Sequence, residues 1–170
     1  VFADLVPPAM AELPAELRAR LRVVQQCRAE DLDRVAEAYR QAKVNVELAA
    51  FFDDLPERMA AAHLVICRSG ASTVAELAAL GRPAILVPLP GAIDADQANN
   101  AKVLDVAGAG WIAAQDTLSP LSLATRLTAL FGDPEGLQRA ADKAAALGQP
   151  DAVLRLADLV ERIARKGATS

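Results

Sequence analysis

Short apolar runs alternate along this chain with longer Ala- and Leu-rich stretches of helical periodicity, and few folds accommodate that alternation. The apolar runs occupy residues 21–27, 44–52, 63–68, 84–89 and 110–114. Each run is followed by a helical pattern, which is typical of β-α-β units and a parallel sheet. The run AILVPL at 84–89 is apolar at successive positions, as expected of a strand covered on both faces. We therefore predict an α/β fold with a Rossmann-like, doubly wound parallel sheet in which 84–89 is central.

The composition narrows the class of protein further. The 170 residues are 53% hydrophobic but only 4% aromatic, which favours helices packed on a sheet over a β-sandwich. The formal net charge is -4 and basic residues are interleaved with acidic ones, so charge indicates neither nucleic acid nor an anionic bilayer as a partner. Because no apolar stretch reaches the roughly 18 to 20 residues of a membrane span and no signal sequence is recognisable, we expect a soluble, cytoplasmic chain.

The cysteine and histidine residues do not have the spacing of a metal site. Cys27, Cys67 and His63 cannot complete a zinc site, and two cysteines are too few for a disulfide scaffold. We expect both thiols to be reduced and to pack as small apolar groups.

The order of the helical patterns indicates how the chain is divided. Residues 1–13 read as a helix with no strand before it, whereas a doubly wound sheet normally begins with a strand and a Gly-rich turn. We therefore expect the chain to begin inside a domain whose first strand is absent. Three closing helices are expected after Ser119, with breaks at 132–134 and 148–150. The predicted organisation is a Rossmann-like domain over 1–150 and a C-terminal helix with a frayed tail over 151–170.

The segment RSGASTVAELAALG, after the third apolar run, contains the main candidate binding residues. A glycine-containing turn here leads directly into a helix, whose first amides and partial positive charge stabilise a phosphate. Gly70 permits close approach of a ligand. The hydroxyls of Ser69, Ser72 and Thr73 can donate to phosphate oxygens, and Glu76 can accept hydrogen bonds from a ribose diol. The residues from Thr73 to Glu76 also match a capping box, in which the carboxylate only reaches back to the cap backbone.

Two further strand ends offer polar groups. The loop PLPGAIDADQANNA follows the predicted central strand, and in open α/β sheets ligands lie beyond such carboxyl ends. Its carboxylate and amide groups, which suit sugar hydroxyls, belong to Asp94, Asp96, Gln97 and Asn100. An ordinary solvated loop with an Asp-capped helix is the alternative. The turn at Phe52 leaves another strand end and its backbone can read a base edge, although the aspartates after it can equally cap the next helix.

These segments resemble one known family. CRSGASTVAELAALGRPAILVPLP at 67–90, followed by DADQANNAKVL at 94–104, is similar to the C-terminal domain of the MurG-type peptidoglycan N-acetylglucosaminyltransferases. The similarity also covers 51–70 and QPDAVLRLADLVERIA at 149–164, so it runs through nearly the whole chain. The resemblance implies the GT-B glycosyltransferase fold, with this chain as its C-terminal, donor-binding half, lacking the first strand and the N-terminal domain.

The resemblance also implies roles for the candidate residues. The turn into the helix matches the family's nucleotide-phosphate segment, and Glu76 matches its ribose-binding acid. Phe52 occupies the position whose backbone pairs with uracil, and Gln97 matches the glutamine that reads the sugar hydroxyls. The residues expected to bind the donor are Phe52, Arg68, Ser69, Gly70, Ala71, Ser72, Thr73, Glu76, Asp96, Gln97 and Asn100.

The implied reaction is inverting transfer of N-acetylglucosamine from UDP-N-acetylglucosamine (UDP-GlcNAc) to lipid-linked muramyl-pentapeptide in peptidoglycan synthesis. Helix-terminus donors would stabilise the leaving diphosphate, so no metal or other cofactor is expected. The resemblance places the general base and the acceptor pocket in the N-terminal domain. We therefore expect no catalytic residue in this chain, and donor binding without catalysis. The full enzyme is expected to be peripheral on the inner face of the bacterial plasma membrane, with the helix at 151–170 packed back toward the N-terminal domain.

The chain departs from the family pattern at two turns. A GGSQG-like turn is not present, and Cys27-Arg28 stands where relatives often have a Ser-Gly or Thr-Gly pair. A family-like sheet order would place the absent strand between those ending at Cys27 and Cys67, which separates the two thiols too widely for a disulfide. Two other functions fit the sequence: a separate donor subunit of a two-subunit lipid-linked sugar transferase, and a non-catalytic α/β interaction module.

Overall fold

The computed structural model describes residues 1–91, 95–149, 157, 160 and 161, and it has the predicted alternation of strands and helices. Each predicted apolar run contains one strand. The strands are β1 Arg22–Gln26, β2 Asn45–Ala49, β3 Val65–Cys67, β4 Ala84–Leu86 and β5 Gly110–Ile112. Every strand pairing is parallel, so the α/β class is confirmed.

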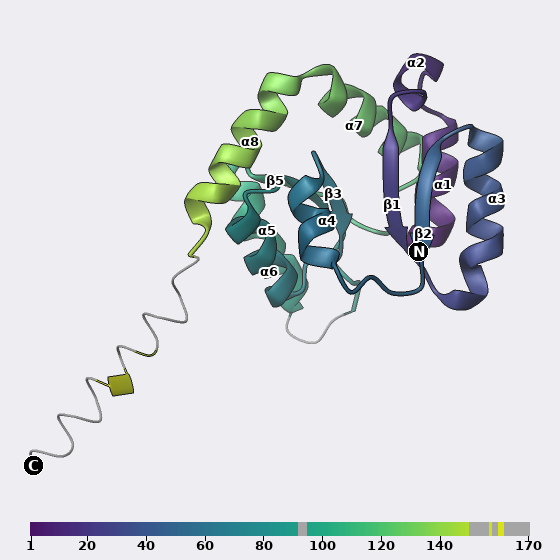
Figure 1. Ribbon diagram of the computed structural model, residues 1–170. Coiled ribbons are helices and arrows are strands. Elements are labelled where there is room, and N and C mark those ends of the chain that lie inside the picture. The colour runs from purple at the N-terminus through teal and green to yellow at the C-terminus, as the bar shows by residue number, and fades with distance from the viewer. Residues whose placement is uncertain (92–94, 150–156, 158–159, 162–170) are drawn as a thin grey trace, which may run out of the picture.

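The strands form two hydrogen-bonded groups. β1 pairs with β2, and β4 lies between β3 and β5. The predicted central position of β4 is confirmed, because all three of its residues are fully buried. The break between the two groups lies between β1 and β3, and none of the described strands occupies it (Figure 1). This is where the sequence analysis expects the absent strand.

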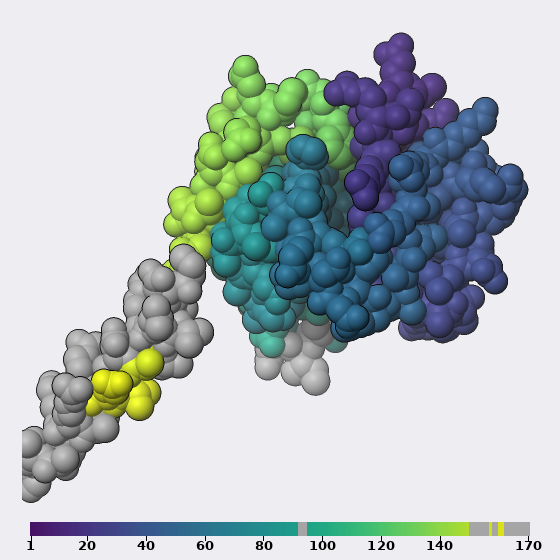
Figure 2. Space-filling model, in the orientation of Figure 1, coloured from purple at the N-terminus to yellow at the C-terminus, as the bar shows by residue number. Residues whose placement is uncertain are grey.

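Helices cover both faces of the three-stranded group, as in a doubly wound fold, and one face of the β1–β2 pair (Figure 1 and Figure 2). One face is covered by α1 Phe2–Ala11, α3 Leu32–Ala42 and α7 Pro120–Gly132. The opposite face of the three-stranded group is covered by α5 Ala71–Leu80, α6 Asp96–Ala107 and α8 Pro134–Leu147. The remaining helical segments are α2 Ala15–Arg18, η1 Ala29–Asp31 and α4 Leu55–Ala61. None of the described helices is long and apolar enough to cross a bilayer.

The residues at and just after β4 alternate between two apolar cores. Ile85 and Val87 pack in the core that contains α1, α3 and α7, whereas Ala84 and Leu86 pack in the core that contains α5, α6 and α8. The alternation follows the two-residue period of a strand. Because β4 is covered on both faces, a ligand can reach it only at an end of the strand.

Glycine and serine residues set several helix ends as the sequence predicts. α5 ends at Gly81, which has a left-handed φ of 62°. Ser119 and Ser122 form a reciprocal capping box at the start of α7, and the side chain of Asp133 accepts a hydrogen bond at the start of α8. Two of the three closing helices are therefore confirmed. The third helix and the predicted boundary at residue 150 lie largely outside the described residues.

Candidate functional site

The two polar segments that follow β3 and β4 meet at Ser69. This side chain is fully buried, and its hydroxyl donates a hydrogen bond to the backbone oxygen of Gln97 at 2.8 Å. The backbone oxygen of Ser69 accepts a hydrogen bond from Asn100 Nδ2 at 3.2 Å. These bonds fasten the turn before α5 to the first turns of α6. The structure therefore brings together two segments that are separate in the sequence.

Gln97 also holds the loop that leaves β4. Its Oε1 atom accepts a hydrogen bond from the backbone N–H of Leu89 at 2.9 Å. A glutamine side chain has one acceptor oxygen and one NH2 donor group, so this bond commits the oxygen to the loop and leaves the NH2 group as the part that can contact a ligand. Asp96, the first residue of α6, is exposed next to it. Asp94 lies outside the described residues.

The N-terminus of α5 has no side-chain cap. The helix begins at Ala71, and Gly70 at the cap position has no side chain that could accept a hydrogen bond. The amides of Ala71, Ser72 and Thr73 have no intrahelical acceptor in an α-helix that starts here. Together with the helix dipole they favour a negatively charged group at this end. Apart from its two chain neighbours, the nearest described atom to a Cβ built on Gly70 is Thr73 Oγ1, at 4.0 Å, so the turn is open at this position.

The alternative interpretation of Thr73 to Glu76 as a capping box is wrong. A capping box requires its first residue at the cap position, but α5 starts at Ala71, so Thr73 lies inside the first turn. The helix can start this early because the extended backbone of Gly70, with φ -61° and ψ 152°, leads directly into it. Glu76 is exposed on α5, and it lies about 7.5 Å along the helix axis from Ala71. Its carboxylate can therefore face a ligand that is held by the first amides.

The side chain of Phe52 is buried and does not offer its ring to a base. The guanidinium of Arg58 lies over this ring at 4.1 Å from its centroid. Arg58 also pairs with Asp54 at 2.6 Å and with Glu47 at 2.9 Å. The hydrogen bond from Arg58 lowers the pKa of the Asp54 carboxyl. Asp54 is at the cap position of α4, as the alternative expected, but it makes no side-chain cap bond. Only the backbone of Phe52 is left for base recognition.

Arg68 lies immediately after β3 and donates hydrogen bonds across the carboxyl end of the sheet. Its Nη1 atom donates to the backbone oxygens of Val87 and Pro88 at 3.0 and 3.1 Å. Its Nη2 atom donates to Gln115 Oε1 at 2.7 Å. The sequence analysis missed Gln115, although its position directly after the run at 110–114 places a polar group at the same edge of the sheet.

The two cysteines are free, as predicted. Burial raises the pKa of the Cys67 thiol to about 12, and burial also raises the pKa of the Cys27 thiol. Both thiols are therefore protonated at neutral pH. Within the part of the chain that the structure describes, no three His, Cys, Asp or Glu residues are grouped so that they could hold a metal ion.

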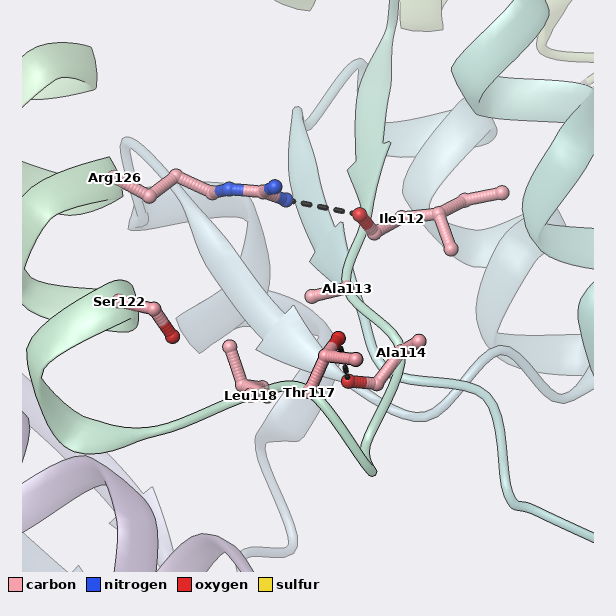
Figure 3. A pocket seen from close by; sticks show the side chains of 7 residues that line it. All are labelled: Ile112, Ala113, Ala114, Thr117, Leu118, Ser122 and Arg126. Atoms are coloured by element: carbon pink, nitrogen blue, oxygen red, sulfur yellow. Dashed lines mark hydrogen bonds between the residues drawn. The ribbon is translucent and has the colours of Figure 1, made fainter.

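A separate cavity of about 370 Å³ lies beside the end of β5 (Figure 3). Its lining residues are Ile112, Ala113, Ala114, Thr117, Leu118, Ser122 and Arg126. Arg126 Nη1 donates to the backbone oxygen of Ile112 at 2.9 Å, and Thr117 Oγ1 donates to that of Ala114 at 3.2 Å. None of the predicted donor-binding residues lines this cavity. The cavity is therefore distinct from the candidate site at the turn and loop after β3 and β4.

Comparison with protein families shows where the chain belongs. Residues 1–156 match the model of the glycosyltransferase family 28 C-terminal domain. The chain belongs to this family. Its similar relatives include the UDP-N-acetylglucosamine--N-acetylmuramyl-(pentapeptide) pyrophosphoryl-undecaprenol N-acetylglucosamine transferase of Rhodospirillum rubrum, which is 58% identical over 164 residues. The protein of the same name from Methylobacterium nodulans is 58% identical over 170 residues.

The matched regions cover only part of each relative. They make up 96% of this chain but 42% of the Rhodospirillum rubrum protein, and 99% of this chain but 46% of the Methylobacterium nodulans protein. The chain therefore spans less than half the length of these curated relatives.

Solved structures confirm the fold expected of the family 28 C-terminal domain. The crystal structure of Acinetobacter baumannii MurG matches with a TM-score of 0.85 and 33% identity, over 95% of this chain and 48% of that chain. The glycosyltransferase VinC in complex with DTDP matches with a TM-score of 0.66 at 20% identity, which shows a shared fold alone. The chain thus has the fold of the C-terminal half of a GT-B glycosyltransferase.

Proposed function

We propose that this chain is the donor-binding half of a MurG-type N-acetylglucosaminyltransferase and binds UDP-GlcNAc at the carboxyl ends of β3 and β4. The observation that carries the proposal is the uncapped N-terminus of α5, with exposed Glu76 on the same helix. The names of relatives that are 58% identical support the choice of donor sugar and of reaction. The activity, substrates and partners of the whole protein belong to this proposal.

The proposed donor lies across the turn and the loop that Ser69 joins. The diphosphate accepts hydrogen bonds from the first amides of α5, the ribose hydroxyls donate to the Glu76 carboxylate, and uracil pairs with the backbone at Phe52. The sugar hydroxyls meet the NH2 group of Gln97, whose oxygen is committed to Leu89. This arrangement follows the rule that open α/β sheets bind ligands beyond the carboxyl ends of their strands.

In the proposed reaction, an acceptor hydroxyl attacks the anomeric carbon of N-acetylglucosamine. The bond from this carbon to the UDP oxygen breaks, and UDP leaves with the bonding electron pair. Negative charge grows on the diphosphate, and the amides of α5 stabilise it more strongly in the transition state than in the bound donor. These neutral donors supply the stabilisation for which a metal cofactor would otherwise be needed.

The proposal assigns the remaining steps to a second domain. An N-terminal domain binds the lipid-linked muramyl-pentapeptide and provides the base that takes the proton of the acceptor hydroxyl. The assembled enzyme works at the inner face of the bacterial plasma membrane as a peripheral protein. This chain alone binds the donor and does not turn it over.

Replacement of the acid on α5 tests the proposal. We expect Glu76→Ala to weaken UDP-GlcNAc binding by about 1 to 3 kcal/mol, through loss of charge-assisted hydrogen bonds. Because the side chain is exposed, the melting temperature should hardly change. Isothermal titration with donor concentrations up to the millimolar range measures the affinity.

Glu16→Ala is the matched control, because Glu16 is an exposed glutamate on α2, which precedes β1 at the opposite end of the strands. This variant should bind UDP-GlcNAc as the unchanged chain does. If the unchanged chain gives no binding heat, the donor assignment fails. Equal affinity of the Glu76 and Glu16 variants would remove Glu76 from the site while leaving the donor assignment in place.

A further inference from the structure

The guanidinium of Arg68 connects the ends of three neighbouring strands. Arg68 follows β3, its acceptors Val87 and Pro88 follow β4, and its acceptor Gln115 follows β5. Each of these bonds joins residues at least 19 positions apart in the sequence. A single side chain therefore sets the relative positions of three segments that leave the same edge of the sheet.

A fourth segment also contacts Arg68. Its guanidinium carbon lies 5.4 Å from the centroid of the Phe2 ring, at the start of α1. Arginine suits this position because its planar group presents several donors in a fixed geometry and stacks on an aromatic face. Lysine keeps the charge but has a single ammonium group, so it cannot bridge the carbonyls and Gln115 in the same way.

The direction of these bonds bears on the role of Arg68 at the candidate site. Both terminal nitrogens donate to acceptors of this chain, and the next residue, Ser69, is fully buried and bonded to α6. Gly70 and the uncapped amides of α5 follow directly. Arg68 thus holds the residue from which the turn before α5 begins, and its three hydrogen bonds to Val87, Pro88 and Gln115 go to the fold.

We propose that Arg68 is a positioning residue, which holds the turn before α5 against the loops after β4 and β5 so that the first amides of the helix face the donor. Its effect on donor affinity rests on the proposed function. The positioning itself does not, because it is a property of the chain without ligand. Gln115 is its partner in this role and makes no direct contact with the donor.

Amide hydrogen exchange of the chain without ligand tests the positioning directly. The reporters are the amide of Val74, which donates to the backbone oxygen of Gly70, and the amide of Leu89, which donates to Gln97 Oε1. In Arg68→Lys we expect both amides to exchange at least about tenfold faster, because hydrogen bonds of a charged group to the two loops are lost. Gln115→Leu, a milder change, should raise the same rates by a smaller factor. Gln115→Glu should keep the slow exchange of the unchanged chain, since its carboxylate can accept a hydrogen bond from the same N–H group. The same exchange rates in all variants and in the unchanged chain would overturn the proposal.

Arg82→Lys provides the matched control. Arg82 is also half-buried and also donates to a backbone oxygen, that of Ala62 at 3.2 Å, but it precedes β4 and so lies at the opposite end of the strand. Its replacement should leave exchange at Val74 and Leu89 unchanged. Faster exchange at these residues in the control as well would show general loosening of the sheet, and would also overturn the specific role of Arg68.

Donor titration separates this proposal from the proposed function. Where the unchanged chain binds UDP-GlcNAc, Arg68→Lys should bind about 10 to 100-fold more weakly and Arg82→Lys equally well. Unchanged affinity of Arg68→Lys would overturn the link to donor binding. If the unchanged chain does not bind UDP-GlcNAc, the proposed function fails, and the exchange rates still decide whether Arg68 positions the turn.

Discussion

At the scale of single residues, Ser69 and Gly70 are neighbours in one turn but have different roles. Ser69 has its hydroxyl inside the fold, bonded to Gln97, and so cannot act as the exposed phosphate donor that its residue type suggests. Gly70 lies at the open side of the turn, where a Cβ built on it would lie 4.0 Å from Thr73 Oγ1, the nearest described atom outside its chain neighbours. Packing explains the serine, whereas the proposed function explains the glycine by the space it leaves for a ligand.

This difference predicts that Gly70→Ala separates stability from binding. The φ of Gly70 is -61°, which any L-residue adopts, and the added methyl meets no close atom. The free energy of unfolding should change by less than about 1 kcal/mol. UDP-GlcNAc affinity should fall, because the methyl stands where a phosphate approaches the amides of α5.

Thermal melting and calorimetric titration measure the two effects of Gly70→Ala. Gly132→Ala is the control, since a Cβ there also meets no described atom within 4 Å and Gly132 lies at the end of α7. A Gly70 variant that binds UDP-GlcNAc as tightly as the Gly132 variant would place the phosphates elsewhere.

At the scale of secondary-structure elements, local patterns predicted the strands and helices well. Apolar runs located the five strands, and glycine or serine residues located helix ends such as Gly81 and Ser119. The strands are shorter than the runs because some apolar residues beyond them are buried in loops, as Val87 and Phe52 are. The start of α5 was the exception. A local capping motif at Thr73 competed there with a turn whose geometry is set by the bonds of Ser69.

The bonds that assemble the candidate site could not be predicted in this way. The Ser69 hydroxyl reaches a residue 28 positions later, and Arg68 reaches one 47 positions later. Such contacts depend on strand order, which places β4 between β3 and β5. Sequence patterns therefore named the segments of the site, whereas the tertiary structure is needed to show which side chains face inward.

The junction between the turn before α5 and α6 leads to a second prediction. Ser69→Ala should lower the free energy of unfolding by about 1 to 2 kcal/mol, because the hydrogen bond from the buried Ser69 hydroxyl to the backbone oxygen of Gln97 is lost. Ser72→Ala, an exposed change in the same turn, should alter it by less than about 0.5 kcal/mol. Urea unfolding followed by circular dichroism measures both. Equal stability of the two variants would mean that this bond does not fasten α6 to the turn.

At the scale of the whole molecule, the break in the sheet divides the strands into two groups that differ in how many hydrogen-bonded neighbours each strand has. β4 has a hydrogen-bonded strand on each side, whereas β1 and β2 have only each other among the described strands. Three of the five residues of β1 are exposed. Local opening should therefore cost less free energy in the β1–β2 pair than in the three-stranded group.

The two cysteines can report on this difference, because each part contains one. Cys27 follows β1 and its amide donates to Ala49 at the end of β2, while Cys67 ends β3 and its backbone oxygen accepts a hydrogen bond from Val87.

Only the thiolate reacts with an alkylating reagent, and burial raises the pKa of Cys67 to about 12. Burial raises the pKa of the Cys27 thiol as well, so both thiols react at pH 8 mainly when their surroundings open. We expect iodoacetamide to label Cys27 several-fold faster than Cys67 in the native chain, as measured by peptide mass spectrometry, and both at similar rates in guanidinium. Faster labelling of Cys67 would mean that local opening costs less free energy in the three-stranded group, which also supports the proposed donor site. That outcome would contradict the view that the break in the sheet sets local stability.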